Sequence, residues 1–224
     1  MARQLRLSLR RPAANTRDAF IRGASNAEAV AALDAWPRWP GGTLALVGPE
    51  GVGKTHLARA WAADTKAVIL NREAPDIAAA AGRPALLEDV DQGVEPEALF
   101  HLINLAVREG ASLLLTARAQ PTAWPAELPD LRSRLNALMV AEIAAPDDDV
   151  LSGVLKKFFR ERNIRPNDDV YPYLLRRMER SIPGAREIVR RLDETEDGTM
   201  RPVSRVLARE ILEDDIENLD LFEG

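Results

Sequence analysis

The apolar positions of the chain follow two different periods, one before and one after residue 146. In the first part, short apolar runs of strand length alternate with segments of helical character. The expected strands are 43–47, 67–70, 85–89 and 113–116, and the expected helices are 25–36, 56–63 and 96–109. Short buried runs that alternate with helices predict an α/β fold, with a parallel sheet flanked by helices.

The second part is expected to be entirely helical. Apolar residues recur at helical spacing between Val150 and Phe159, behind a run of three Asp that suits a capped helix start, and amphipathic segments follow at 171–178, 185–192 and 203–212. We therefore expect an α/β domain over 17–146 and a small all-helical domain over 147–212. Residues 1–16 are expected to form an extended arm, and 213–224 an acidic tail.

Composition excludes several classes of protein. The 224 residues include no Cys and two His, which excludes a disulfide scaffold, a Cys-rich zinc site and a cysteine nucleophile. A net charge of -5 argues against tight, unaided binding to duplex DNA. No apolar run has the length of a membrane span, so we expect a cytoplasmic protein. The six Arg of the first 22 residues, taken alone, are also compatible with an organelle transit peptide.

The strongest motif is a phosphate-binding loop. Residues 48–55 match G-x-x-x-x-G-K-[ST] in full and lie between an expected strand and an expected helix. Backbone N–H groups of such a loop bind phosphate, its Lys reaches the β- and γ-phosphates, and its Thr binds Mg²⁺. His56, which follows this motif, is assigned to the site as well, although the simpler interpretation places it on the surface of the helix. The candidate nucleotide-binding residues here are Gly48, Pro49, Glu50, Gly51, Val52, Gly53, Lys54, Thr55 and His56.

Acidic and polar residues follow two other expected strands. Glu88 and Asp89 end the expected strand 85–89 and Asp91 comes just after it, where a nucleotide site needs an acid to hold Mg²⁺ and to orient water. Thr116 and Arg118 stand at the tip of the strand 113–116. Because parallel strands end at a common edge, we expect these groups to approach the phosphate loop.

These pieces, in this order, resemble the AAA+ nucleotide-binding core of the bacterial replication initiator family of DnaA, and more specifically its shorter, Hda-type members. The resemblance extends from about Asp18 to Leu212. It predicts an AAA+ P-loop core followed by a helical lid, and it counts against a transit peptide. The stretches that carry it are 20–26, 48–56, 88–89, 115–121, 128–135 and 183–189.

The resemblance implies roles for residues in the chain's own nucleotide site. Phe20 and Ile21 lie in the segment that receives the adenine, and Thr116 and Arg118 in the sensor-1 strand and its tip. With Thr55, Glu88 stands at the magnesium position. The family more often has Asp there, so the longer side chain predicts weak self-hydrolysis. The bound nucleotide is ADP or ATP, with Mg²⁺.

Further catalytic roles are implied for one acid and three arginines. Asp89 corresponds to the hydrolytic acid, and Arg186 to the sensor-2 arginine of the lid. Arg134, with Arg132 as the alternative, corresponds to the arginine finger, which stabilises the γ-phosphate charge in a neighbouring subunit.

Both ends of the chain contain short interaction motifs. Gln4, Leu5, Leu7 and Leu9 resemble the peptide by which Hda-type proteins bind the DNA polymerase sliding clamp. Alternate apolar side chains of an extended peptide can fill a hydrophobic groove in this way. Residues 218–222 resemble a second such peptide, and a solvated acidic tail is the favoured alternative there.

The resemblance implies an adaptor that stimulates hydrolysis of DnaA-bound ATP and so inhibits the initiation of DNA replication. It would act at the bacterial nucleoid and replisome, with the sliding clamp and DnaA as partners and a possible homo-oligomer. No sequence-specific DNA binding is expected, because the chain ends about a dozen residues after Leu212. Two alternatives stay open: an autonomous ATPase of the helicase-loader or clamp-loader type, and a membrane or polar-localisation adaptor, for which no basic amphipathic helix is found.

Overall fold

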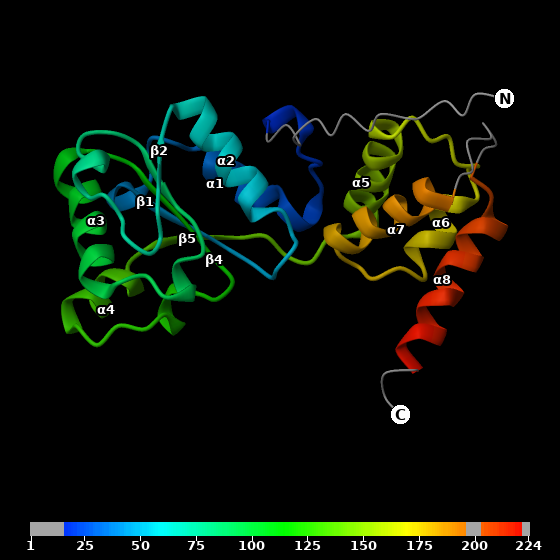
Figure 1. Ribbon diagram of the computed structural model, residues 1–224. Coiled ribbons are helices and arrows are strands. Elements are labelled where there is room, and N and C mark those ends of the chain that lie inside the picture. Colours follow the sequence, from blue (N-terminus) through cyan, green and yellow to red (C-terminus); the bar gives the residue numbers. More distant parts are fainter. Residues whose placement is uncertain (1–15, 196–202, 221–224) are drawn as a thin grey trace, which may run out of the picture.

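The computed structural model describes residues 16–195 and 203–220. Its first part is built on one parallel sheet in the order β2-β3-β4-β1-β5, with helices on both faces, and its second part is helical (Figure 1). The expected α/β fold with a parallel sheet is confirmed. The strands are β1 Thr43–Val47, β2 Val68–Leu70, β3 Ala85–Leu87, β4 Leu113–Ala117 and β5 Met139–Glu142.

Two pairs of helices cover the two faces of the sheet. Along β4, Leu114 packs with one pair while Leu113 and Leu115 pack with the other. Burial on both faces explains why the central strands are apolar throughout rather than alternating. One face carries α1 Ala27–Asp34 and α2 Lys54–Thr65, and the other carries α3 Pro96–Glu109 and α4 Pro129–Asn136.

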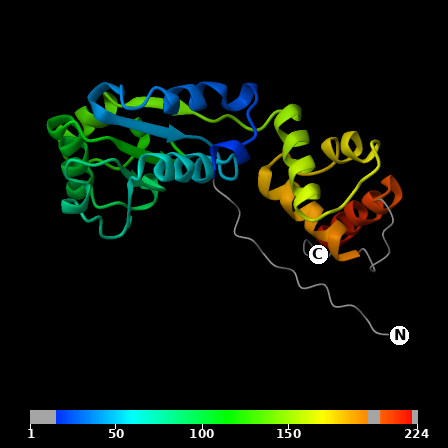
Figure 2. The same cartoon turned by 90° about the horizontal axis from the view of Figure 1, so that it is seen from above.

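The helical part has its own apolar cluster, which includes the buried rings of Phe158 and Phe159. The carboxylate of Asp147 caps its first helix by accepting the N–H of Val150 at 2.8 Å, as the run of Asp predicted. Figure 2 shows this helical part, called the lid below, to one side of the sheet. Its helices are α5 Asp148–Glu161, α6 Val170–Leu175, α7 Ile182–Thr195 and α8 Arg205–Asp220, so α8 continues into the stretch expected to be a tail.

Two elements had no signal strong enough to be expected from the sequence. β5 is a short edge strand in which Ala141 is buried and Val140 is exposed, and α4 is only eight residues long. The expected strand at 85–89 ends at Leu87, so both acids lie beyond it. No described helix is both long enough and apolar enough to cross a membrane.

Candidate nucleotide site

The phosphate loop joins β1 to α2 with glycines in conformations that other residues rarely adopt. The φ angles of Gly48, Gly51 and Gly53 are 151°, 75° and 103°. A Cβ on Gly48 would lie 2.3 Å from the carbonyl oxygen of Ile143, and one on Gly51 would lie 2.6 Å from Cδ of Pro183 in the lid. Glycine is therefore required both by the backbone and by its neighbours. The loop places its N–H groups at the N-terminus of α2, where anions bind.

Lys54 is buried inside this loop, with 7% of its surface exposed. Its Nζ donates to the carbonyl oxygens of Gly48 at 2.7 Å and of Pro49 at 2.8 Å. Burial lowers the pKa of Lys54, while the negative charge of nearby Asp89 opposes the shift. A buried ammonium held inside the loop is suited to an anionic ligand.

Asp89 is held in place by the neighbouring strand. It adopts a left-handed conformation, with φ 53° and ψ 47°, two residues after the end of β3. Its N–H donates at 3.0 Å to the hydroxyl of Thr116, which is fully buried in β4. Because β3 and β4 are parallel neighbours, both residues lie at one edge of the sheet. The fold thus brings Asp89 together with Thr116 and places its charge near Lys54.

Glu88 is directed elsewhere. Its Oε2 accepts a hydrogen bond from Nε of Arg59 in α2 at 2.9 Å and forms an ion pair with Nη2, also at 2.9 Å, and 15% of its side chain is exposed. Thr55, in the first turn of α2, is exposed. The described residues contain no group of three or more His, Asp or Glu that could hold a metal. The residues present therefore fit a phosphate group, but Glu88 does not fit a magnesium ligand in this arrangement.

Asp91 has a role that the sequence did not indicate. Its Oδ2 accepts the N–H groups of Arg118 at 2.9 Å and of Ala119 at 3.1 Å, and it thereby fixes the loop that follows β4. The guanidinium of Arg118 in turn lies 2.9 Å from Glu50 of the phosphate loop. Asp91 is thus a positioning residue for the sensor loop, and only the proximity of residues 91 and 118 in the fold reveals it.

Phe20 and His56 lie together beside the loop. The ring of Phe20 would be 3.1 Å from a Cβ on Gly53, and its centroid is 5.5 Å from that of His56. Nε2 of His56 donates to the carbonyl of Thr16 at 3.0 Å, and burial lowers the pKa of His56. His56 is therefore half-buried and hydrogen-bonded, not a free position on the helix surface. Ile21 instead packs against Gly153 of the lid.

The lid brings positive charge toward the same place. Arg186 of α7 lies with its guanidinium 4.4 Å from the ring centroid of Phe158, and its charge helps to lower the pKa of His56. Lys157 of α5 donates to the carbonyl of Ala19 at 2.7 Å. Phosphate loop, N-terminal segment and lid thus converge on one region.

The two candidate arginine fingers differ in their surroundings. Nη1 and Nη2 of Arg132 donate to the carbonyls of Thr122 at 2.8 Å and of Trp124 at 3.0 Å. Arg134, two residues later in α4, is exposed, and its guanidinium makes no hydrogen bond or ion pair within the described residues. Figure 1 shows α4 on the side of the sheet away from the lid.

Two predicted motifs lie outside this description. The candidate clamp-binding residues Gln4, Leu5, Leu7 and Leu9 fall before residue 16, where the described part of the chain begins. Of 218–222, the structure describes only the helical backbone as far as Asp220. Both motifs stay predictions.

Comparison with curated proteins finds distant relatives among chromosomal replication initiators. DnaA of Thermomicrobium roseum is 27% identical over 116 residues, which are 52% of this chain and 25% of that protein. DnaA of Flavobacterium psychrophilum is 22% identical over 233 aligned positions, covering 90% of this chain and 49% of that protein. The chain thus spans about half, or less, of the length of these relatives. No family model matches the chain.

Comparison with solved structures identifies the fold. Domain III of DnaA from Thermotoga maritima aligns with a TM-score of 0.72 at 18% identity, covering 89% of this chain and 96% of that one. AMPPCP-bound DnaA from Aquifex aeolicus aligns with a TM-score of 0.66 at 21% identity, covering 83% of this chain and 66% of that one. The branch-migration motor RuvB of T. maritima aligns with a TM-score of 0.67 at 18% identity, covering 89% of this chain and 71% of that one. The chain thus has the fold of DnaA domain III and is distantly similar to DnaA in sequence.

Proposed function

We propose that the chain is a nucleotide-binding AAA+ adaptor of the Hda type. It binds ADP or ATP in the phosphate loop, binds the sliding clamp through residues 4–9, and presents Arg134 to ATP held by DnaA. Hydrolysis of that ATP then switches the initiator off. In this proposal the chain's own nucleotide fixes the lid against the core, and clamp binding brings the adaptor to DNA.

Nucleotide binding is supported by the loop and by what surrounds it. Lys54 and Asp89 lie close enough for their charges to interact, and the lid contacts Gly51 directly through Pro183. A phosphate group in the loop would offer Lys54 a charged acceptor in place of the two carbonyls it now binds. Replacement of Lys54 by Ala should abolish binding of ADP in calorimetry, whereas Lys66→Ala, at the other end of α2, should not.

The observation that carries the adaptor role is the contrast between the two arginines of α4. Arg132 is committed to two backbone carbonyls, while Arg134 is exposed and available to another molecule. An arginine finger must reach a neighbour's γ-phosphate, so it cannot be used up inside its own subunit. The position of α4 away from the lid supports action on a partner rather than on the chain's own nucleotide (Figure 1).

The test is hydrolysis of DnaA-bound ATP in the presence of clamp loaded on DNA, this chain and ADP. The wild type should accelerate hydrolysis, and Arg134→Ala should lower the stimulated rate by about 1000-fold or to the unstimulated level, since arginine fingers contribute about 10³–10⁵ in rate. A chain lacking residues 1–10 should fail for want of clamp binding. Arg108→Ala, an exposed arginine of α3, is the matched control and should act as the wild type.

An autonomous ATPase is the second candidate, and the placement of Asp89 favours it. The Thr116 hydroxyl holds Asp89 beside Lys54, as self-hydrolysis requires. The pairing of Glu88 with Arg59 counts against it. Turnover of ATP by the chain alone that is lost in Asp89→Asn, together with no effect on DnaA, would move the function to this candidate.

A further inference from the structure

The ion pair between Arg59 and Glu88 joins α2, which begins at the phosphate loop, to the end of β3. Both Nε and Nη2 of Arg59 bind the same carboxylate oxygen, each at 2.9 Å. The other oxygen, Oε1, is buried and has no hydrogen-bond partner. Of the described residues, Arg59 is therefore the only one that forms a hydrogen bond or an ion pair with this carboxylate.

The position of Arg59 follows from helix geometry. It comes four residues after Thr55 in α2, so the two side chains lie on the same face, about 6 Å apart along the axis. Helical side chains lean toward the N-terminus, which brings the guanidinium back toward Thr55. The expected place of a cation next to Thr55 thus has a fixed positive charge close by.

We propose that Arg59 is a positioning residue that keeps the Glu88 carboxylate away from magnesium, so that the site binds a nucleoside di- or triphosphate with little dependence on the metal. The inference rests on the proposed nucleotide binding and adds to it that this binding depends little on magnesium. Two effects act in the same direction. The ion pair occupies the negative charge that a cation would need, and the guanidinium repels a second cation at the same spot.

The pair also accounts for Glu at this position. With two methylenes, Glu88 extends from the end of β3 to the face of α2 on which Arg59 lies, whereas the shorter Asp reaches less far. The side chain of Arg59 is 49% exposed, so the pair is partly screened and its strength is that of a single surface ion pair. Its removal should therefore change the magnesium dependence by a modest, measurable factor.

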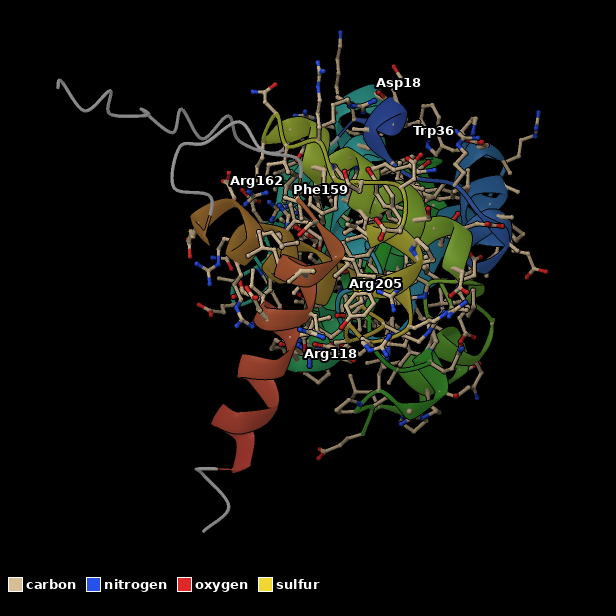
Figure 3. The ribbon with its side chains drawn as sticks, turned by 90° about the vertical axis from the view of Figure 1, so that its right-hand side faces the viewer. Asp18, Trp36, Arg118, Phe159, Arg162 and Arg205 are labelled. Atoms are coloured by element: carbon tan, nitrogen blue, oxygen red, sulfur yellow. The ribbon has the colours of Figure 1, made fainter. Side chains whose placement is uncertain are left out.

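The experiment measures the affinity of the full chain for ADP and for ATP by calorimetry, in magnesium and in EDTA. The wild-type affinity should change by less than about threefold, and Arg59→Gln should gain a magnesium dependence of about fivefold. Glu88→Gln should leave the wild-type values unchanged, and the double variant should gain less magnesium dependence than Arg59→Gln, because only the repulsion has been removed. Arg162→Gln is the matched control, because Arg162 lies in the lid beside Phe159 and pairs with Asp193 at 3.4 Å (Figure 3).

The outcomes separate this inference from the proposed function. If the wild type binds nucleotide but loses affinity in EDTA by as much as Arg59→Gln, the role of Arg59 is wrong and the nucleotide site stands. If neither nucleotide binds in either buffer, the proposed function fails. Should Arg59→Gln not fold, as judged by thermal melting, the wild-type comparison and Arg59→Lys, which keeps the charge but not the paired donors, decide the question.

Discussion

At the scale of single residues, the phosphate loop shows how backbone and packing act on the same position. Gly48 combines φ 151° with a Cβ position 2.3 Å from a backbone oxygen, so two separate costs apply to any substitution. Gly82 has φ 64° and open space around its Cβ position, so only the conformational cost applies. Comparing substitutions at Gly48 and Gly82 therefore separates the cost of backbone strain from the cost of steric collision.

We expect Gly82→Ala to lower the free energy of unfolding by about 1 kcal/mol, from the left-handed conformation alone. Gly48→Ala should lower it by about 3 kcal/mol or more, because the carbonyl of Ile143 has to move. Urea unfolding of both variants measures the difference. Equal losses would show that the collision is relieved at no cost.

His56 supplies a prediction of pH dependence. Burial lowers its pKa below the ordinary 6.5 and the charges of Lys157 and Arg186 lower it further, while the hydrogen bond to Thr16 and the charge of Glu161 oppose the shift. The unfolded chain then binds more protons than the folded chain as the pH falls below about 6.5, so the free energy of unfolding decreases toward acid. His56→Gln should flatten this part of the curve. His101→Gln, at the exposed second histidine, should leave it unchanged in the same urea titrations.

At the scale of elements, α4 shows how neighbours on one helix take different roles. Arg132 and Arg134 are two residues apart, so they point to different sides of the helix. One side faces the loop containing Thr122 and Trp124, and the other faces outward. One arginine thus stabilises the domain, while the other is available at its surface.

Arg132→Ala should lower the free energy of unfolding by about 1–2 kcal/mol, because two hydrogen bonds to carbonyls are lost. Arg134→Ala should change it by less than about 0.5 kcal/mol. Thermal or urea unfolding separates the two without any partner protein. A large loss of stability for Arg134→Ala would contradict the exposed position and weaken its use as a finger variant.

At the scale of the whole molecule, one carboxylate joins the core to the lid. Asp147 accepts the N–H of Val150 at the start of α5 and that of Ser25, at 3.0 Å, in the core. These bonds, with Val150 the larger effect, lower the pKa of Asp147 below the ordinary 3.8. The stabilisation is therefore present above that pH and is lost as the pH falls below it.

Asp147→Ala should lower the free energy of unfolding by about 1–2 kcal/mol at neutral pH, as for other helix caps. The loss should shrink in acid, where the wild-type carboxylate is protonated. Asp149→Ala removes an exposed acid from the same first turn and is the control, with an expected loss of about 0.5 kcal/mol. Urea unfolding at several pH values tests both.

Local patterns along the chain were enough to predict the parallel sheet, the phosphate loop and the helical character of the lid. These patterns are short apolar runs, spaced glycines and helical periodicity, which a segment has wherever it is placed in the fold. β5 was not predicted, because an edge strand with a single buried residue, Ala141, has no such pattern.

Which side chains meet became known only from the folded chain. Glu88 pairs with Arg59, Asp91 holds the loop at Arg118, and His56 binds the N-terminal segment, over separations of 29, 27 and 40 residues. A motif states which residue types are present, but the partner of each charge depends on distances set by the packing of distant elements. The pairing of Glu88 with Arg59 in α2 is an example, because no motif in the sequence indicates it.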